Sequence, residues 1–239
     1  MPSFEILLPL GAIAFYLYDS ALLLHGNELV LVCRGGHWLI RGGSDLRVAG
    51  KRLYLPNPLT PQALLFRVAW STSDRRSQHD SAAAIEAFRA SLQFLRVLVI
   101  AQIVILMVLL PGLSWTLGSG GPLLGVIALF YALVLLALLV IYRRRESLGL
   151  TLKGYWLLAL DVLACAPFAA NIVRKLSLQR SIRGNPLHFA RANFDALSRG
   201  SLLQLLELRL REELAGEQSG TARHGELQGF LDQLPAMLT

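Results

Sequence analysis

Apolar residues gather into four long runs along the chain, with polar segments between them. The first run covers residues 6–24, the next two cover 92–116 and 123–142, and the fourth covers 154–173. A helix of about 20 apolar residues crosses a hydrocarbon core about 30 Å thick. The pattern predicts an α-helical polytopic membrane protein with three spans and a fourth segment that is either re-entrant or spanning.

Residues 25–80 have a different pattern, in which short apolar runs alternate with glycine-containing turns. Runs of this length that are rich in aliphatic, aromatic and β-branched residues are typical of strands. We therefore expect a basic, β-rich module containing one small antiparallel sheet. We also expect a short helix that opens at Pro61, because proline is favoured in a first helical turn. The four predicted strands are Glu28–Cys33, His37–Arg41, Leu46–Ala49 and Arg52–Leu55.

Helical spacing returns at Ser81, and residues 81–142 are predicted to form a transmembrane hairpin whose turn, residues 117–122, carries no charge. The fourth apolar run is less regular because it contains Asp161, Pro167 and Asn171. Proline breaks or kinks a helix. A re-entrant segment broken at Pro167 is favoured, and a fourth full span remains the alternative.

Residues 176–239 are expected to form a helical tail. Leucines repeat at helical spacing over residues 201–215, and a last helix is expected over 226–234, ending at Pro235. The leucine stripe is either intramolecular core or a face that docks a partner; it consists of Leu203, Leu206, Leu210 and Leu214. The predicted division of the chain is 1–24 (first span), 25–80 (β module), 81–142 (hairpin), 143–175 (basic loop and fourth segment) and 176–239 (tail).

Composition supports a membrane protein. Hydrophobic residues make up 54% of the chain and charged residues only 16%, and the mean hydropathy is +0.50. A soluble domain has about a quarter charged residues, so an ordinary soluble or disordered protein is excluded. The formal net charge of +7 is interpreted as a topology signal, because Lys and Arg accumulate on cytoplasmic segments.

The distribution of basic residues predicts an orientation. The β module and the loop after residue 142 are basic and the hairpin turn is uncharged, so we expect the turn outside, and the module and tail inside, the inner membrane of a bacterium. Basic side chains beside the apolar runs are expected to contact anionic lipid headgroups. These are Arg143, Arg144, Arg145, Arg174 and Lys175.

Candidate chemistry is sparse. Asp19, Asp161 and Asn171 lie within apolar runs, and intramembrane carboxylates are candidate ion or proton sites. They could share a polar pocket if the first and fourth segments packed together. The alternative is a structural role in which Asp161 pairs with Lys153 or an arginine. We expect Cys33 and Cys165 to remain thiols, and we assign no catalytic residue, metal ligand or cofactor, because the five histidines are dispersed.

The leading hypothesis is a non-enzymatic integral membrane subunit or scaffold of a bacterial inner-membrane complex, which binds partners through its module and tail. Its expected partners are membrane lipids and either other membrane subunits or further copies of itself, and no nucleic acid. One alternative is a transporter or proton-conducting component that uses Asp19 and Asp161. Another is an integral-membrane enzyme acting on lipid. No family resemblance favours one of these.

Overall fold

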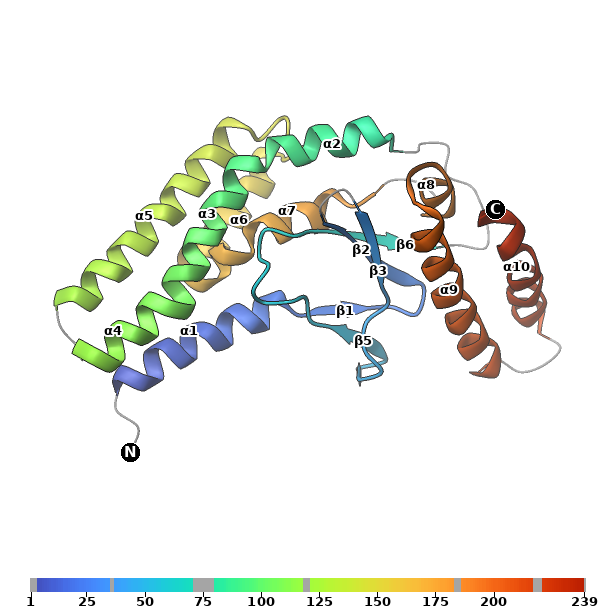
Figure 1. The fold of residues 1–239 in the computed structure, drawn as a ribbon, viewed down its shortest axis with the longest axis horizontal. Coiled ribbons are helices and arrows are strands. Elements are labelled where there is room, and N and C mark those ends of the chain that lie inside the picture. Colours follow the sequence, from blue (N-terminus) through green and yellow to red (C-terminus); the bar gives the residue numbers. More distant parts are fainter. Residues whose placement is uncertain are drawn as a thin grey trace. The chain divides into compact units, whose positions relative to one another are not determined.

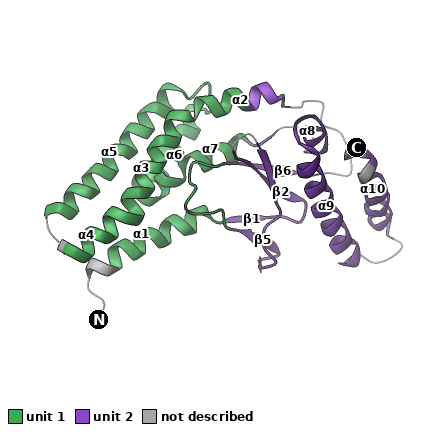
Figure 2. Cartoon of the chain, in the orientation of Figure 1, with its two compact units in different colours: residues 1–21, 55–63, 86–180 green, residues 22–54, 64–85, 181–239 purple. Residues whose placement is uncertain are grey.

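The computed structural model describes residues 4–34, 37–70, 80–117, 121–182, 186–216 and 221–238. Figure 1 shows the helices and strands along the chain. The chain divides into two compact units, coloured separately in Figure 2. Unit 1 contains residues 1–21, 55–63 and 86–180, and unit 2 contains 22–54, 64–85 and 181–239.

Unit 1 is helical and contains two helical segments long and apolar enough to cross a membrane. The first, Gln93–Thr116, combines α3 (Gln93–Val104), η1 (Ile105–Leu109) and most of α4 (Leu110–Leu117). The second is α5 (Gly121–Arg143). At 24 and 23 residues, each is about 35 Å long. These two long apolar helices of the predicted hairpin are confirmed, whereas residues 118–120 of its turn lie outside the described residues.

The first apolar run is shorter as a helix than predicted. Helix α1 extends from Phe4 to Ser20, 17 residues, or about 26 Å, and residues 22–24 form strand β1 instead. A third span is therefore not confirmed. Pairing with β5 ends the helical run, because the backbone of Leu22–Leu24 forms a ladder with Arg52–Tyr54.

The first long helix passes through a proline. Residues Ile105–Leu109 form a π-helical turn, in which the N–H of Leu110 donates to the carbonyl of Ile105, and Pro111 follows. A proline cannot donate an N–H, and its ring clashes with a carbonyl one turn earlier. The wider π turn accommodates these demands, so the helix continues.

The fourth apolar run is broken into three pieces. Helix α6 (Leu152–Ala164) is capped by Thr151, whose side chain accepts a hydrogen bond from the N–H of Gly154. The 3-10 helix η2 (Ala166–Asn171) contains Pro167, and α7 (Ile172–Arg180) follows. Within unit 1, η2 packs against α1, α3 and α5. Helix α2 (Ala82–Ser91) precedes α3 and is capped by Ser81.

Unit 2 contains two small antiparallel sheets rather than the single predicted sheet. In one, β5 (Lys51–Tyr54) lies between β1 (Leu22–Leu24) and β4 (Arg47–Val48). In the other, β2 (Glu28–Arg34) lies between β3 (His37–Arg41) and β6 (Leu64–Ala69). The turn between β4 and β5 is tight, with positive φ angles at Ala49 and Gly50. The helix expected at Pro61 is absent, since residues 61–62 form a turn.

Three helices complete unit 2: α8 (Pro186–Asn193), α9 (Ala196–Gly216) and α10 (Ala222–Leu238). Helix α9 packs against β3 and α10. Trp38 of β3 contacts Phe66, Phe189 and Phe194, with ring centroids 5.2–5.9 Å apart. The last helix continues past Pro235, beyond the predicted end.

The buried stripe of α9 differs from the predicted docking face. Leu202, Leu206 and Leu210 have no exposed surface, whereas Leu203 and Leu214 are half-buried. Leu206 and Leu210 therefore belong to the core of unit 2 and have no surface that a partner could contact in this conformation. The physical reason is that unit 2 supplies its own apolar surface, the strands and α10, to cover them.

Candidate functional site

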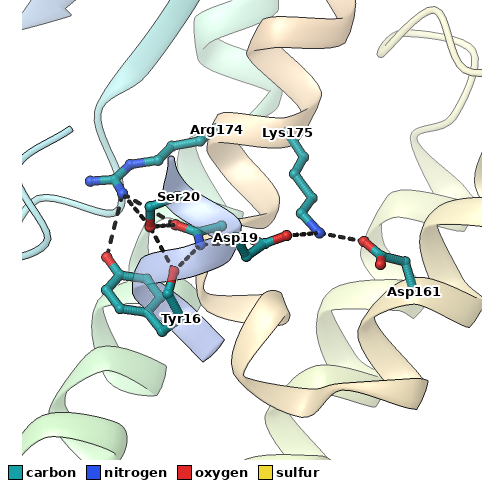
Figure 3. Close-up of polar contacts among 7 residues, drawn as sticks. Tyr16, Asp19, Ser20, Asp161, Arg174 and Lys175 are labelled. Atoms are coloured by element: carbon teal, nitrogen blue, oxygen red, sulfur yellow. Dashed lines mark hydrogen bonds and ion pairs between the residues drawn. The ribbon is translucent and has the colours of Figure 1, made fainter. Parts of the chain in front are cut away.

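A cluster of polar side chains lies among the helices of unit 1 (Figure 3). We call it the Asp19 cluster, and it consists of Tyr16, Asp19, Ser20, Asp161, Asn171, Arg174 and Lys175. Its residues come from the end of α1, from α6, and from the junction of η2 with α7.

Lys175 links the two carboxylates of the cluster. Its Nζ lies 2.8 Å from Oδ1 of Asp19 and also forms an ion pair with Oδ2 of Asp161. Figure 3 shows the ammonium between the two acids. The same Nζ lies 4.7 Å from the ring centroid of Phe168, which adds a cation–π contact. Asp161 is thus paired, but with Lys175 and not with Lys153 or an arginine.

Arg174 is the most deeply buried charge of the cluster, with 2% of its surface exposed. Its Nη1 donates to Tyr16 Oη, Ser20 Oγ and Asn171 Oδ1 at 3.2–3.4 Å. Its Nη2 donates to the carbonyls of Asn57 and Thr60 at 2.6 and 2.9 Å. One guanidinium therefore joins α1, the junction of η2 with α7, and the segment 55–63, which suits its planar set of five N–H donors.

Asn171 and Tyr16 complete the network. Asn171 Nδ2 donates to Asp19 Oδ2 at 3.0 Å and to the carbonyl of Tyr16 at 3.1 Å, while its Oδ1 accepts from Ser20. The Tyr16 hydroxyl donates to the carbonyl of Pro58 at 2.6 Å. Every polar atom of the Asn171 side chain is used, so this residue fixes α1 against η2.

The structure places Asp19, Asp161 and Asn171, the three residues of the predicted polar site, in this one cluster. The two acids are bridged through Lys175, and Asn171 contacts only Asp19 among the acids. The two carboxylates and the two cations of Arg174 and Lys175 give the cluster no formal net charge. Paired in this way, they are suited to holding helices together.

Two of the residues predicted to contact lipid headgroups have partners within unit 1 instead. Arg174 is buried, and Lys175 is taken up by two carboxylates. An apolar helix cannot bury a charge unless it is paired or hydrogen-bonded, and the partners are present here. Arg143 at the end of α5 and Arg144 just after it are exposed, and Arg145 is half-buried beside the ring of Tyr142.

Sequence reasoning missed Tyr16, Ser20 and the structural role of the two basic residues. The available signal was helical spacing. Tyr16, Asp19 and Ser20 stand at positions i, i+3 and i+4, and so do Asn171, Arg174 and Lys175. Residues at this spacing share one helix face, so the two triplets form complementary polar faces on two otherwise apolar segments.

Unit 1 also contains an apolar pocket of about 470 Å³. Its walls come from α1, η1, α5 and the α6–η2 junction, and they include Phe15, Ile105, Phe130, Cys165 and Pro167. The lining is almost entirely apolar, so the pocket suits hydrocarbon and not a polar substrate.

Searches against protein families, curated proteins and solved structures found no match to this chain. Within the described ranges, no group of three or more His, Cys, Asp or Glu side chains is placed to hold a metal ion. Cys33 and Cys165 are not joined in a disulfide.

Proposed function

We propose that the chain is a non-enzymatic scaffold subunit of a bacterial inner-membrane complex, anchored by unit 1 and bound to partner proteins through unit 2. The observation that carries the proposal is the charge balance of the Asp19 cluster. Its acids and bases are paired with one another, so the cluster stabilises the packing of the helices that carry them. A proton path would need carboxylates that are not engaged by a cation, whereas both of these are ion-paired with Lys175.

The anchoring role is supported by the surfaces of the two long helices. Large apolar side chains remain exposed along both, including Val97 and Val108 on the first and Leu124 and Leu135 on α5. Apolar surface of this kind is favourable in contact with lipid, whereas its contact with water costs free energy. Arg143 and Arg144 would then meet the headgroups on the cytoplasmic side, with unit 2 on that same side.

The partner-binding role is supported by helix α9. Leu197 and Leu208 expose 82% and 55% of their surface, and they lie about three helical turns apart, on the same side of the helix. Two exposed leucines on one helix face suit docking of an apolar partner helix. We propose this face, in place of Leu206 and Leu210, as the contact with another subunit or with a second copy of the chain.

The test is purification of the tagged full chain from its own membrane in mild detergent, with quantification of copurifying proteins and of native mass. We expect a partner in near-stoichiometric amount, or a defined homo-oligomer. Replacement of both leucines, L197S with L208S, should reduce that partner about tenfold. The matched control is L46S, since Leu46 is an exposed leucine elsewhere in unit 2.

Recovery of the chain alone as a monomer would contradict the proposal. The double variant D19N/D161N separates the alternatives. A scaffold should keep its partner in this variant, provided that it still folds, whereas loss of a measured ion flux with the partner retained would favour a conducting component.

A further inference from the structure

A second polar site lies in unit 2, where α9 and α10 meet the β4–β5 hairpin. It is a pocket of about 280 Å³, close to the lower end of the range for small-molecule sites. Four arginines line it, Arg47, Arg52, Arg209 and Arg223, together with Glu212 and Glu213. These residues leave a formal surplus of two positive charges.

Arg209 is the innermost of these arginines, with 4% of its surface exposed. Its Nη2 donates to the carbonyl of Gly42, which fixes the side chain. Its Nε and Nη1 are buried and have no hydrogen-bond partner among the described residues. Buried N–H groups almost always have an acceptor, so these two donors point to an acceptor other than the described residues.

Glu212 places two of the other three arginines, Arg52 and Arg47. Arg52, nearly as buried as Arg209, pairs with Glu212 and with Asp45, whose carboxylate lies 3.2 Å away. Arg47 and Arg209 lie 3.9 and 3.8 Å from the same Glu212 oxygen. The Glu212 carboxylate thus contacts three guanidinium groups and, together with Asp45 on Arg52, offsets two of their three charges.

Two glycines lie close to the arginines of the pocket. Gly50 lies in the β4–β5 turn with a positive φ of 77°, and a Cβ there would meet nothing within 4 Å. At Gly42 an added Cβ would lie 2.6 Å from Arg209 Nη2, so a larger residue would displace the innermost guanidinium.

We propose that this pocket binds a phosphate group, either on a lipid headgroup or on a soluble phosphoester. A phosphate carries about −1.5 to −2 charges at neutral pH, opposite in sign to the pocket, whose lining residues have a surplus of two positive charges that the Asp45 paired with Arg52 reduces to one. Its three or more oxygens can accept from several guanidinium groups at once, whereas a carboxylate has two.

An adjoining hollow gives room for the organic part of the ligand. It shares Gly26, Glu213, Arg223 and Leu227 with the arginine pocket and reaches Trp70. The indole of Trp70 stacks on Phe230, and its Nε1 is buried with no acceptor among the described residues. A phosphoester bound to the arginines would therefore extend toward the indole of Trp70, whose Nε1–H is a hydrogen-bond donor.

The experiment is calorimetric titration of the detergent-purified full chain with inorganic phosphate, glycerol 3-phosphate and short-chain phosphatidic acid, against chloride at matched ionic strength. We expect saturable binding of phosphate. R47Q and R223Q should each weaken it about tenfold, because one charged hydrogen-bonding group is lost. Both side chains are exposed, so these variants should keep the fold even where R209Q does not.

The matched control is R211Q, because Arg211 is an exposed arginine of the same helix, paired with Glu207, and does not line the pocket. Its affinity for phosphate should stay within twofold of wild type. Tighter binding of phosphatidic acid than of glycerol 3-phosphate would support the site with a lipid headgroup as ligand, and equal binding would support it with a soluble phosphoester. The proposal is overturned if none of the three ligands binds above the chloride baseline, or if R211Q weakens binding as much as R47Q.

Discussion

Asp161 of α6 and Lys175 of α7 form an ion pair although 14 residues separate them. In one continuous helix they would lie about 21 Å apart along the axis. The pair can form only because the chain bends sharply through η2, which begins beside Pro167. Pro167 and the ion pair therefore act together. The proline interrupts the helix, and the ion pair between Asp161 and Lys175 stabilises the contact of α6 with α7.

The ion pairs of Lys175 predict an order of stabilities. K175M leaves the largely buried carboxylate of Asp19, and the partly exposed one of Asp161, without their cation, so it should cost about 3 kcal/mol. D161N leaves Lys175 paired with Asp19 and should cost less than about 1 kcal/mol. Thermal unfolding of the detergent-solubilised protein measures both, with K153M as an exposed control. Equal losses in K175M and K153M would remove the structural role of the cluster.

Arg174 gives a second prediction, centred on the segment 55–63. R174K keeps the charge but cannot reach five acceptors on three segments, so it should release the carbonyls of Asn57 and Thr60. Limited proteolysis should then cut within 55–63 at least tenfold faster than in wild type. R143K, at an exposed arginine, is the control and should leave the rate unchanged. If both variants are cut alike, Arg174 does not hold this segment.

Much of the fold followed from local pattern, and the exceptions have physical causes. The two long helices were predictable because a helix that is apolar on most of its sides gives a continuous apolar run in the sequence. Strand β1 was not, because Leu22–Leu24 continues the apolar run of α1 and becomes a strand only by pairing with β5. Strand β6 also escaped prediction: Leu64–Ala69 is mostly buried, so it lacks the alternation that marks a half-exposed strand.

The Asp19 cluster was predictable in part. Asp19, Asp161 and Asn171 stood out because polar residues in apolar runs are rare. Arg174 and Lys175 were assigned to lipid headgroups because they follow an apolar run, as headgroup-binding residues do. Pro167 predicted a break in this segment, but the sequence pattern does not show that the break brings Arg174 and Lys175 onto α1.

The hairpin predicts a sidedness that labelling can measure. Thr116 is exposed at the end of the first long helix, and Ser147 is exposed just after the second, so they mark opposite ends of the hairpin. With Cys33 and Cys165 replaced by serine, T116C should react with an impermeant thiol reagent added outside intact cells, and S147C only after the membrane is opened. The reverse pattern would invert the orientation, and labelling of both from outside would exclude a transmembrane hairpin.

Glu28 predicts a pH dependence of unit 2. Burial opposes its ionisation, but hydrogen bonds from the backbone N–H and ring of His25, together with the charge of Arg67, outweigh burial and hold the pKa of Glu28 below its usual range. A carboxylate with a lowered folded-state pKa stabilises the fold above its unfolded pKa, and this contribution is lost as the pH falls through the folded value. Stability should therefore decrease below about pH 4.5, the ordinary pKa of a glutamate.

The measurement is the unfolding midpoint as a function of pH. E28Q, which cannot gain this charge-dependent stability, should flatten the acid limb, whereas E146Q, at an exposed glutamate of unit 1, should not. An unchanged acid limb in E28Q would show that other groups control it.

The two sides of α9 give the last prediction, because they separate a core face from a docking face on one helix. Leu206 has no exposed surface and faces the core, whereas Leu208 is 55% exposed. L206A should cost about 2–5 kcal/mol, the range for emptying a buried leucine site, and L208A should stay within about 0.5 kcal/mol. Hydrogen exchange of β3 reports the difference locally, since α9 packs on that strand and Ser198 Oγ donates to the carbonyl of Trp38 at 2.9 Å. Faster exchange over His37–Arg41 in L206A alone fits this packing, and protection of β3 that is insensitive to L206A would place α9 elsewhere.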